Sequence, residues 1–125
     1  MTEGRPLVLI VDDERLLVES LSELLSEDFD VVSAASVAEG VARLRADPPV
    51  DAVLADLHLS DGTGIDLYRT CREVAPGRER RIVFFTGGNV SSSVAAQIAA
   101  TGCPCLDKPF DFDALVGVLR KVAAA

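Results

Sequence analysis

The sequence has few of the side chains on which several common kinds of protein depend. Its 125 residues include no tryptophan, one tyrosine, one methionine, one histidine and three cysteines. An odd number of cysteines does not fit a disulfide framework, and a structural zinc site usually needs four Cys or His ligands. Cys71, Cys103 and Cys105 also lack metal-ligand spacing. We therefore interpret the cysteines as small buried hydrophobic residues.

The chain also lacks long apolar runs and an excess of positive charge. No run approaches the roughly 20 apolar residues that cross a bilayer, and the opening residues MTEGRP lack the apolar core of a signal peptide. We therefore expect a cytoplasmic protein without a membrane partner. A net charge of −8 and a pI near 4.5 argue against binding of nucleic acid by this chain.

With 49% hydrophobic residues, the chain is long and apolar enough for one domain with a buried core. We expect a single domain over residues 1–125, with residues 1–5 as a flexible N-terminal tail. Short apolar runs predict strands at LVLIV (7–11), AVLA (52–55) and IVFF (82–85). DVVSA (30–34) and CPCL (103–106) are weaker strand candidates.

Amphipathic stretches with helical spacing lie between these runs. Leu17, Leu21, Leu24 and Leu25 predict a helix within 14–27, and Ser36 with Glu39 forms a capping box that opens a second. The predicted helices cover 14–27, 36–46, 64–74, 90–101 with Gly102 at its end, and DFDALVGVLRKV with Asp111 as its cap. A βα unit repeated five times predicts an α/β fold, with a parallel sheet between two layers of helices.

Polar side chains follow four of the five predicted strands. Asp12 and Asp13 follow the first strand, Asp56 the third, Thr86 the fourth and Lys108 the fifth. Each alone has an ordinary explanation: Asp13 as a helix cap, Asp56 as a turn residue, Thr86 as a strand end and Lys108 as a solvated cation. Because the carboxyl ends of parallel strands meet at one edge, we expect these groups to lie together in a ligand site.

Three carboxylates in one cleft need compensation. Two of these carboxylates about 4 Å apart repel by roughly 4 kcal/mol at an effective dielectric of about 20. Either the pKa of one carboxyl is therefore raised, or the three carboxylates bind a cation. Oxygen ligands favour Mg²⁺, which can accept phosphoryl oxygens in its open positions. A carboxylate beside a metal ion and a lysine is a competent nucleophile toward phosphorus. The site is therefore predicted to accept a phosphoryl group.

The motifs VLIVDDE, AVLADLHLSDGTGIDL, VFFTGG and CLDKPF, in this order and at these spacings, cover essentially the whole chain. In them the sequence resembles the receiver domains of two-component response regulators. The resemblance implies a flavodoxin-like (βα)5 fold, a doubly wound parallel five-stranded sheet in the order 2-1-3-4-5. It further implies that Asp56 is the phosphoacceptor, and that Asp12, Asp13, Asp56 and the backbone carbonyl of His58 hold Mg²⁺.

The resemblance implies roles for three more residues. Thr86 would bond the phosphoryl group in the active state, Lys108 would pair with the acceptor and then with the phosphoryl group, and the Lys108–Pro109 bond would be cis. The phosphoryl donor would be a histidine kinase or a histidine phosphotransfer protein. Such a domain assists its own phosphoryl transfer and hydrolysis but is not a turnover enzyme.

The chain departs from the family pattern at several positions. Cys105 stands where the family usually carries Tyr or Phe, so we expect output to depend on the loop after Thr86 and on helix 90–101. Ser60 replaces a common proline in the loop after the acceptor. His58 and Gly88 occupy the two positions that tune self-dephosphorylation in the family.

Other functions remain open at this stage. An aspartyl hydrolase of the haloacid-dehalogenase type needs an Asp-x-Asp pair after the first strand, where this chain has Asp12 and Glu14. A flavodoxin-like nucleotide binder needs a glycine-rich phosphate loop there. A pseudo-receiver that binds partners without phosphorylation is the main alternative, and Cys105 keeps it open. The chain is either a stand-alone receiver or part of a larger protein, and TGG with KPFD favours the C-terminal receiver of a hybrid histidine kinase.

Overall fold

The computed structural model describes residues 5–87, 90–108 and 111–124. Its elements are β1 (Leu7–Val11), α1 (Arg15–Leu25), β2 (Asp30–Ala34), α2 (Val37–Leu44), β3 (Ala52–Asp56), β4 (His58–Leu59), β5 (Gly62–Thr63), α3 (Gly64–Val74), the 3₁₀ helix η1 (Arg78–Arg81), β6 (Ile82–Thr86), α4 (Ser92–Thr101), β7 (Cys105–Asp107) and α5 (Phe112–Ala124). Five parallel strands form one sheet in the order β2-β1-β3-β6-β7, and β4 pairs with β5 in a separate hairpin. The order corresponds to 2-1-3-4-5, so the predicted α/β fold is confirmed.

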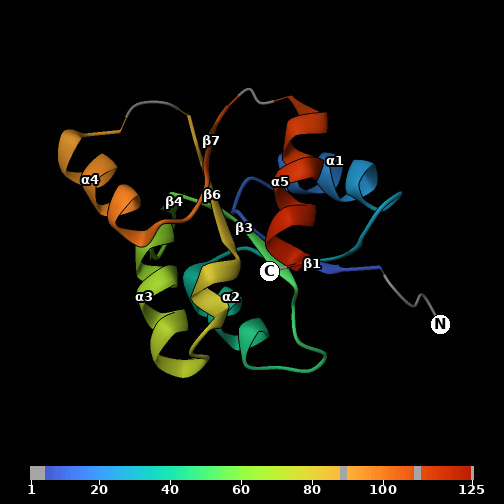
Figure 1. Cartoon of the computed structure of the whole chain (residues 1–125), viewed down its shortest axis with the longest axis horizontal. Helices are drawn as coiled ribbons and strands as arrows, with labels where there is room; N and C mark the ends of the chain where they lie inside the picture. The colour runs from blue at the N-terminus through green and yellow to red at the C-terminus, as the bar shows by residue number, and fades with distance from the viewer. Residues whose placement is uncertain (1–4, 88–89, 109–110, 125) are drawn as a thin grey trace.

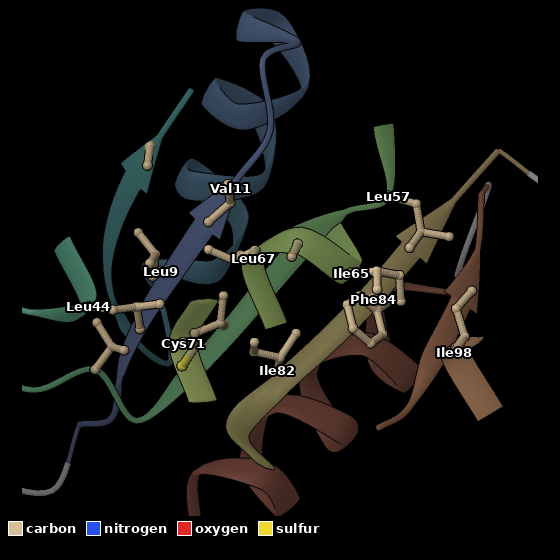
Figure 2. Close-up of a cluster of buried hydrophobic side chains, with 14 residues drawn as sticks. Leu9, Val11, Leu44, Leu57, Ile65, Leu67, Cys71, Ile82, Phe84 and Ile98 are labelled. Atoms are coloured by element: carbon tan, nitrogen blue, oxygen red, sulfur yellow. The ribbon is translucent and has the colours of Figure 1, made fainter. Parts of the chain in front are cut away.

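Helices cover both faces of the sheet (Figure 1), with α2 and α3 on one side and α1 and α5 on the other. Alternate residues of β1 point into different cores, because successive side chains of a strand face opposite ways. Leu9 and Val11 belong to the core beneath α2 and α3, drawn in Figure 2, whereas Val8 and Ile10 belong to the core beneath α1 and α5. All four side chains are fully buried, which explains the uninterrupted apolar run.

Several predicted elements begin or end at other residues than expected; helices 36–46 and 90–101 are observed as Val37–Leu44 and Ser92–Thr101. The last strand begins at Cys105 rather than Cys103, and Pro104 precedes it because proline has no N–H for the ladder; its carbonyl accepts from the Phe84 N–H at 2.9 Å. Helix α1 is shorter than 14–27, and Leu24 is 49% exposed. The leucine spacing therefore overstated the buried face of this helix.

The interpretation of the cysteines is right for one of the three. Cys71 is fully buried, and burial raises the pKa of its thiol to about 11. Cys103 is half-buried and donates from Sγ to the Glu79 carbonyl at 3.4 Å. Cys105 is exposed, so for this residue the interpretation as a buried hydrophobe is wrong; it lies on the edge strand of the sheet.

Two expectations concern the ends of elements or of the chain. Residues 1–4 of the expected tail lie outside the described residues, whereas the Arg5 guanidinium donates to the carbonyls of Ser26 and Phe29. Gly102 ends α4 with a positive φ of 73°, as predicted.

Within the described ranges, none of the helices combines the length and apolar character that crossing a membrane requires.

Gly64 is expected to be intolerant of a side chain. A Cβ there would lie 2.9 Å from the Asp56 carbonyl oxygen and 3.1 Å from Phe84 Cδ1, so backbone or core must shift. We expect Gly64→Ala to lower the free energy of unfolding by about 1–3 kcal/mol in urea denaturation. Gly117→Ala in α5 is the control, because nothing lies within 4 Å of its Cβ, and it should stabilise by about 0.5–1 kcal/mol. Equal effects of the two substitutions would contradict this account of the packing.

Candidate functional site

The carboxyl ends of β1, β3, β6 and β7 bring the predicted polar residues to one edge of the sheet. The Asp12 N–H donates to the Ala34 carbonyl at 3.0 Å, which fixes the backbone directly after β1. The Lys108 N–H donates to the Thr86 carbonyl at 2.7 Å, which joins the chain after β7 to the end of β6. Asp56 is the last residue of β3 and is paired in register with Phe85 of β6. Rigid strand ends therefore position the side chains.

Three carboxylates cluster at this edge. One oxygen from each of Asp12, Asp13 and Asp56 lies within 4.8 Å of the others. Asp12 and Asp56 are buried, with 2% and 7% exposure, and Asp13 is exposed. Glu14 is the N-cap of α1, and its side chain makes no capping bond. The alternative interpretation of Asp13 as the helix cap is therefore wrong.

Asp12 is the most perturbed of these groups. Burial, aided by the neighbouring Asp56 carboxylate, raises the pKa of Asp12 to about 6, although the Glu14 N–H and Lys108 oppose the shift. Asp12 Oδ1 accepts from the Glu14 N–H at 2.9 Å. Asp12 Oδ2 is buried and has no hydrogen-bond partner among the described residues. A buried carboxylate oxygen in this state is in need of a positive partner.

Lys108 supplies positive charge to the pocket. Its Nζ lies 3.6 Å from Asp56 Oδ2 and 3.9 Å from Asp12 Oδ2. It also lies over the Phe85 ring, 4.5 Å from the centroid, in a cation–π arrangement. The aromatic face restricts where the long lysine side chain can go, so the ammonium is held between the two buried carboxylates.

The other oxygen of Asp56 contacts the loop that follows it. The His58 N–H donates to Asp56 Oδ1 at 3.2 Å, while the His58 side chain is exposed. The Leu57 N–H donates to the Phe85 carbonyl at 3.1 Å, which continues the β3–β6 pairing by one residue. Thr86 is 2% exposed at the end of β6. The Asp56 carboxylate is thus held from two sides, with Lys108 on one oxygen and His58 on the other.

The donor set of this pocket fits a divalent cation of the magnesium type. All three acidic side chains offer hard oxygen ligands, one buried oxygen lacks a hydrogen bond, and one ammonium faces two of the carboxylates. The His58 carbonyl stays a predicted ligand. Gly88 and the Lys108–Pro109 bond, also singled out from the sequence, involve positions outside the described residues.

The structure thus combines a parallel five-stranded α/β fold with an acidic cluster and a lysine at the carboxyl edge of its sheet. Residues 8–120 match the family model of the response regulator receiver domain. The chain therefore belongs to the receiver domain family of two-component systems, in which phosphorylation-dependent signalling is the general role.

Relatives agree with this assignment. The chain is 42% identical over 109 residues to the photosynthetic apparatus regulatory protein RegA of Cereibacter sphaeroides, covering 86% of this chain and 56% of that protein. It is 37% identical over 116 residues to the acid tolerance regulatory protein ActR of Rhizobium meliloti, covering 90% of this chain and 57% of that protein. The chain thus spans a little over half the length of these relatives.

Solved structures show the same fold. A response regulator receiver protein from Pseudomonas putida matches with a TM-score of 0.84 at 28% identity, covering 96% of this chain and 99% of that one. A CheY-like receiver domain protein from Methanospirillum hungatei matches with a TM-score of 0.83 at 24% identity, covering 97% and 95%.

Three contributors to the site escaped the sequence analysis. Phe85 lies beneath Lys108, the β4–β5 hairpin carries His58, and Asp61 in the turn of that hairpin bonds to α2. The apolar run of β6 gave no hint of a cation–π contact. The sequence LSDGTG did signal a tight turn, and this turn signal could have found the hairpin.

Removing the Asp12 charge should stabilise the protein in a pH-dependent way. With a folded pKa of about 6 against an ordinary 3.8, the folded state binds a proton more readily than the unfolded state. Stability from this group therefore falls as pH rises from about 4 to 6. In metal-free buffer at pH 7.5, Asp12→Asn should raise Tm by about 3–6 °C, the shift that roughly 1 kcal/mol produces in a domain of this size.

The gain from Asp12→Asn should shrink toward zero near pH 4, where wild-type Asp12 is protonated in the folded state. Thermal melts at several pH values with a chelator present measure it. Asp107→Asn, an exposed carboxylate on the edge strand β7, serves as the control for net charge. A gain that is the same at pH 4 and pH 7.5 would contradict the assignment of the shift to Asp12.

Proposed function

We propose that this chain accepts a phosphoryl group on Asp56, with Mg²⁺, from the phosphohistidine of a histidine kinase or a histidine phosphotransfer protein. The observation that carries the proposal is the state of the Asp56 carboxylate. It is buried at the end of β3, with Lys108 Nζ 3.6 Å from one oxygen and the Asp12 carboxylate beside it.

Asp12, Asp13, Asp56 and the His58 carbonyl would hold the Mg²⁺. The ion supplies positive charge that neutralises the carboxylates and the oxygens of the incoming phosphoryl group. Among the described residues, Asp12 Oδ2 accepts no hydrogen bond, and this oxygen together with the short distances between the three carboxylates supports this assignment. The exposed Asp13 offers a ligand at the open side of the pocket, where a donor would approach.

The transfer needs little covalent chemistry from the protein. An Asp56 oxygen attacks the phosphorus and the phosphorus–nitrogen bond of the donor breaks. The donor imidazole, protonated on its other nitrogen, leaves with that electron pair as a neutral ring. Lys108, now held between Asp12 and Asp56, offsets negative charge on the transferring group. The Thr86 hydroxyl, at the buried end of the neighbouring strand β6, would bond a phosphoryl oxygen afterwards.

Intact mass spectrometry tests the acceptor. Incubation with Mg²⁺ and a small phosphodonor such as acetyl phosphate should add one phosphoryl group to the wild type and none to Asp56→Asn. Asp107→Asn, which removes an exposed carboxylate from the edge strand, should keep the adduct. An unmodified wild type would favour the pseudo-receiver alternative, and an adduct that persists in Asp56→Asn would overturn the choice of acceptor.

We further propose that phosphorylation is read out through the loop after Thr86 and through α4. Helix α4 buries one side chain, Ile98, while Val94 is half-buried. Cys105 is exposed on the neighbouring edge strand and has neither the bulk nor the reach of an aromatic side chain. Weak anchoring gives α4 a low barrier to movement.

Hydrogen exchange should show this response. Phosphorylation is expected to change the exchange rates of the α4 amides by about threefold or more, while the core amides of β1 and β3 keep their rates. Asp56→Asn under the same conditions is the control. Unchanged exchange throughout α4 on a fully phosphorylated sample would rule out this route.

A further inference from the structure

The loop after the phosphoacceptor is tied to α2 by one side chain, Asp61. The loop folds as the β4–β5 hairpin, with His58 opposite Thr63 and Leu59 opposite Gly62. Ser60 and Asp61 form its two-residue turn. The Asp61 carboxylate extends from this turn to another element and accepts from the Val37 N–H at 2.8 Å and the Ala38 N–H at 3.1 Å.

These two hydrogen bonds provide acceptors for backbone N–H groups at the amino end of α2. The first N–H groups of a helix have no partner within the helix and attract negative charge. Ser36 Oγ accepts from the Glu39 N–H at 3.1 Å, which leaves Val37 and Ala38 to a group from elsewhere. The two backbone N–H groups hold the pKa of Asp61 below its usual range. The carboxylate is therefore bound as an anion to the helix terminus.

The same hairpin contacts the phosphoacceptor at its other end. The His58 N–H donates to Asp56 Oδ1 at 3.2 Å. Gly62 is packed closely, since a Cβ there would lie 2.9 Å from Asp66 Oδ2 and 3.2 Å from Val37 Cγ2. The hairpin thus spans the distance between the Asp56 carboxylate and the start of α2, with Asp61 at the α2 end.

We propose that Asp61 is a positioning residue for the phosphoacceptor site. By holding the hairpin on α2, it holds the His58 backbone against Asp56, so that the N–H stays on one carboxylate oxygen and the carbonyl stays available to Mg²⁺. Asp61 touches neither the metal site nor the phosphoryl group and acts through the hairpin. Because Mg²⁺ binding at Asp56 belongs to the proposed function, the effect of Asp61 on metal affinity rests on that function.

Three variants separate the possible roles of Asp61. Asp61→Ala removes both hydrogen bonds and the charge, whereas Asp61→Asn removes the same charge and keeps one oxygen acceptor. Ser36→Ala removes the other cap of the same helix end and leaves the hairpin anchor in place. Two measurements are made on each: the dissociation constant for Mg²⁺ from an NMR titration with MgCl₂, and the backbone order parameters of residues 58–63 in a chelator.

Asp61→Ala should raise the Mg²⁺ dissociation constant about threefold to tenfold, the range expected for loss of a capping interaction. The order parameters of residues 58–63 should fall from values near 0.85 toward about 0.6. Asp61→Asn should lie between Asp61→Ala and the wild type in both measurements. Ser36→Ala should lower Tm and leave the affinity and the order of the hairpin at wild-type values.

Several outcomes would overturn the role of Asp61. Equal losses of affinity in Asp61→Ala and Ser36→Ala would assign the effect to the stability of α2. Equal losses in Asp61→Ala and Asp61→Asn, with an ordered hairpin in both, would assign it to charge alone. If the wild type fails to bind Mg²⁺, the proposed function fails. The order parameters in chelator then still test the anchor, and unchanged values in Asp61→Ala refute it.

Discussion

At the carboxyl edge of the sheet, two buried carboxylates face one lysine ammonium, and the strands hold these groups together. Asp12 and Asp56 are buried at adjacent strand ends, and Lys108 Nζ lies within 4 Å of both. One oxygen of Asp12 has no hydrogen bond from the described residues. Carboxylates free to move would separate or turn toward water. These stay together because β1 and β3 are neighbouring strands whose backbones cannot separate without breaking the sheet.

The two apolar cores compensate for the free-energy cost of holding the buried carboxylates close together. β1 and β3 lie inside the sheet, and their side chains enter the cores on both faces. Burial of so much apolar surface in the central strands outweighs local repulsion at their ends. The apolar interior therefore supports the polar edge: a stable sheet holds a pocket in which one buried carboxylate oxygen accepts no hydrogen bond from the described residues.

Most of the fold and the main site residues could be predicted because both follow from strand positions. Apolar runs marked the strands, and the rule that ligands bind at the carboxyl ends of parallel strands selected Asp12, Asp56, Thr86 and Lys108. Contacts between distant turns and helices could not be predicted. Asp61 reads as an ordinary turn residue, and its partner Val37 lies 24 positions away. The exposure of Cys105 was also missed, because an edge strand and a central strand share the same local pattern.

The two oxygens of Asp56 face two different parts of the molecule. Oδ2 faces Lys108, which follows β7, and Oδ1 accepts from His58, whose hairpin reaches α2 through Asp61. A phosphoryl group on Asp56 would change the charge and the hydrogen bonding on both sides at once. On the β7 side, Cys105 offers a small exposed thiol in place of an aromatic ring. On the hairpin side, hydrogen bonds link Asp56 to His58 and Asp61 to α2. The hairpin therefore connects the Asp56 carboxylate to the amino end of α2 through backbone pairing and hydrogen bonds.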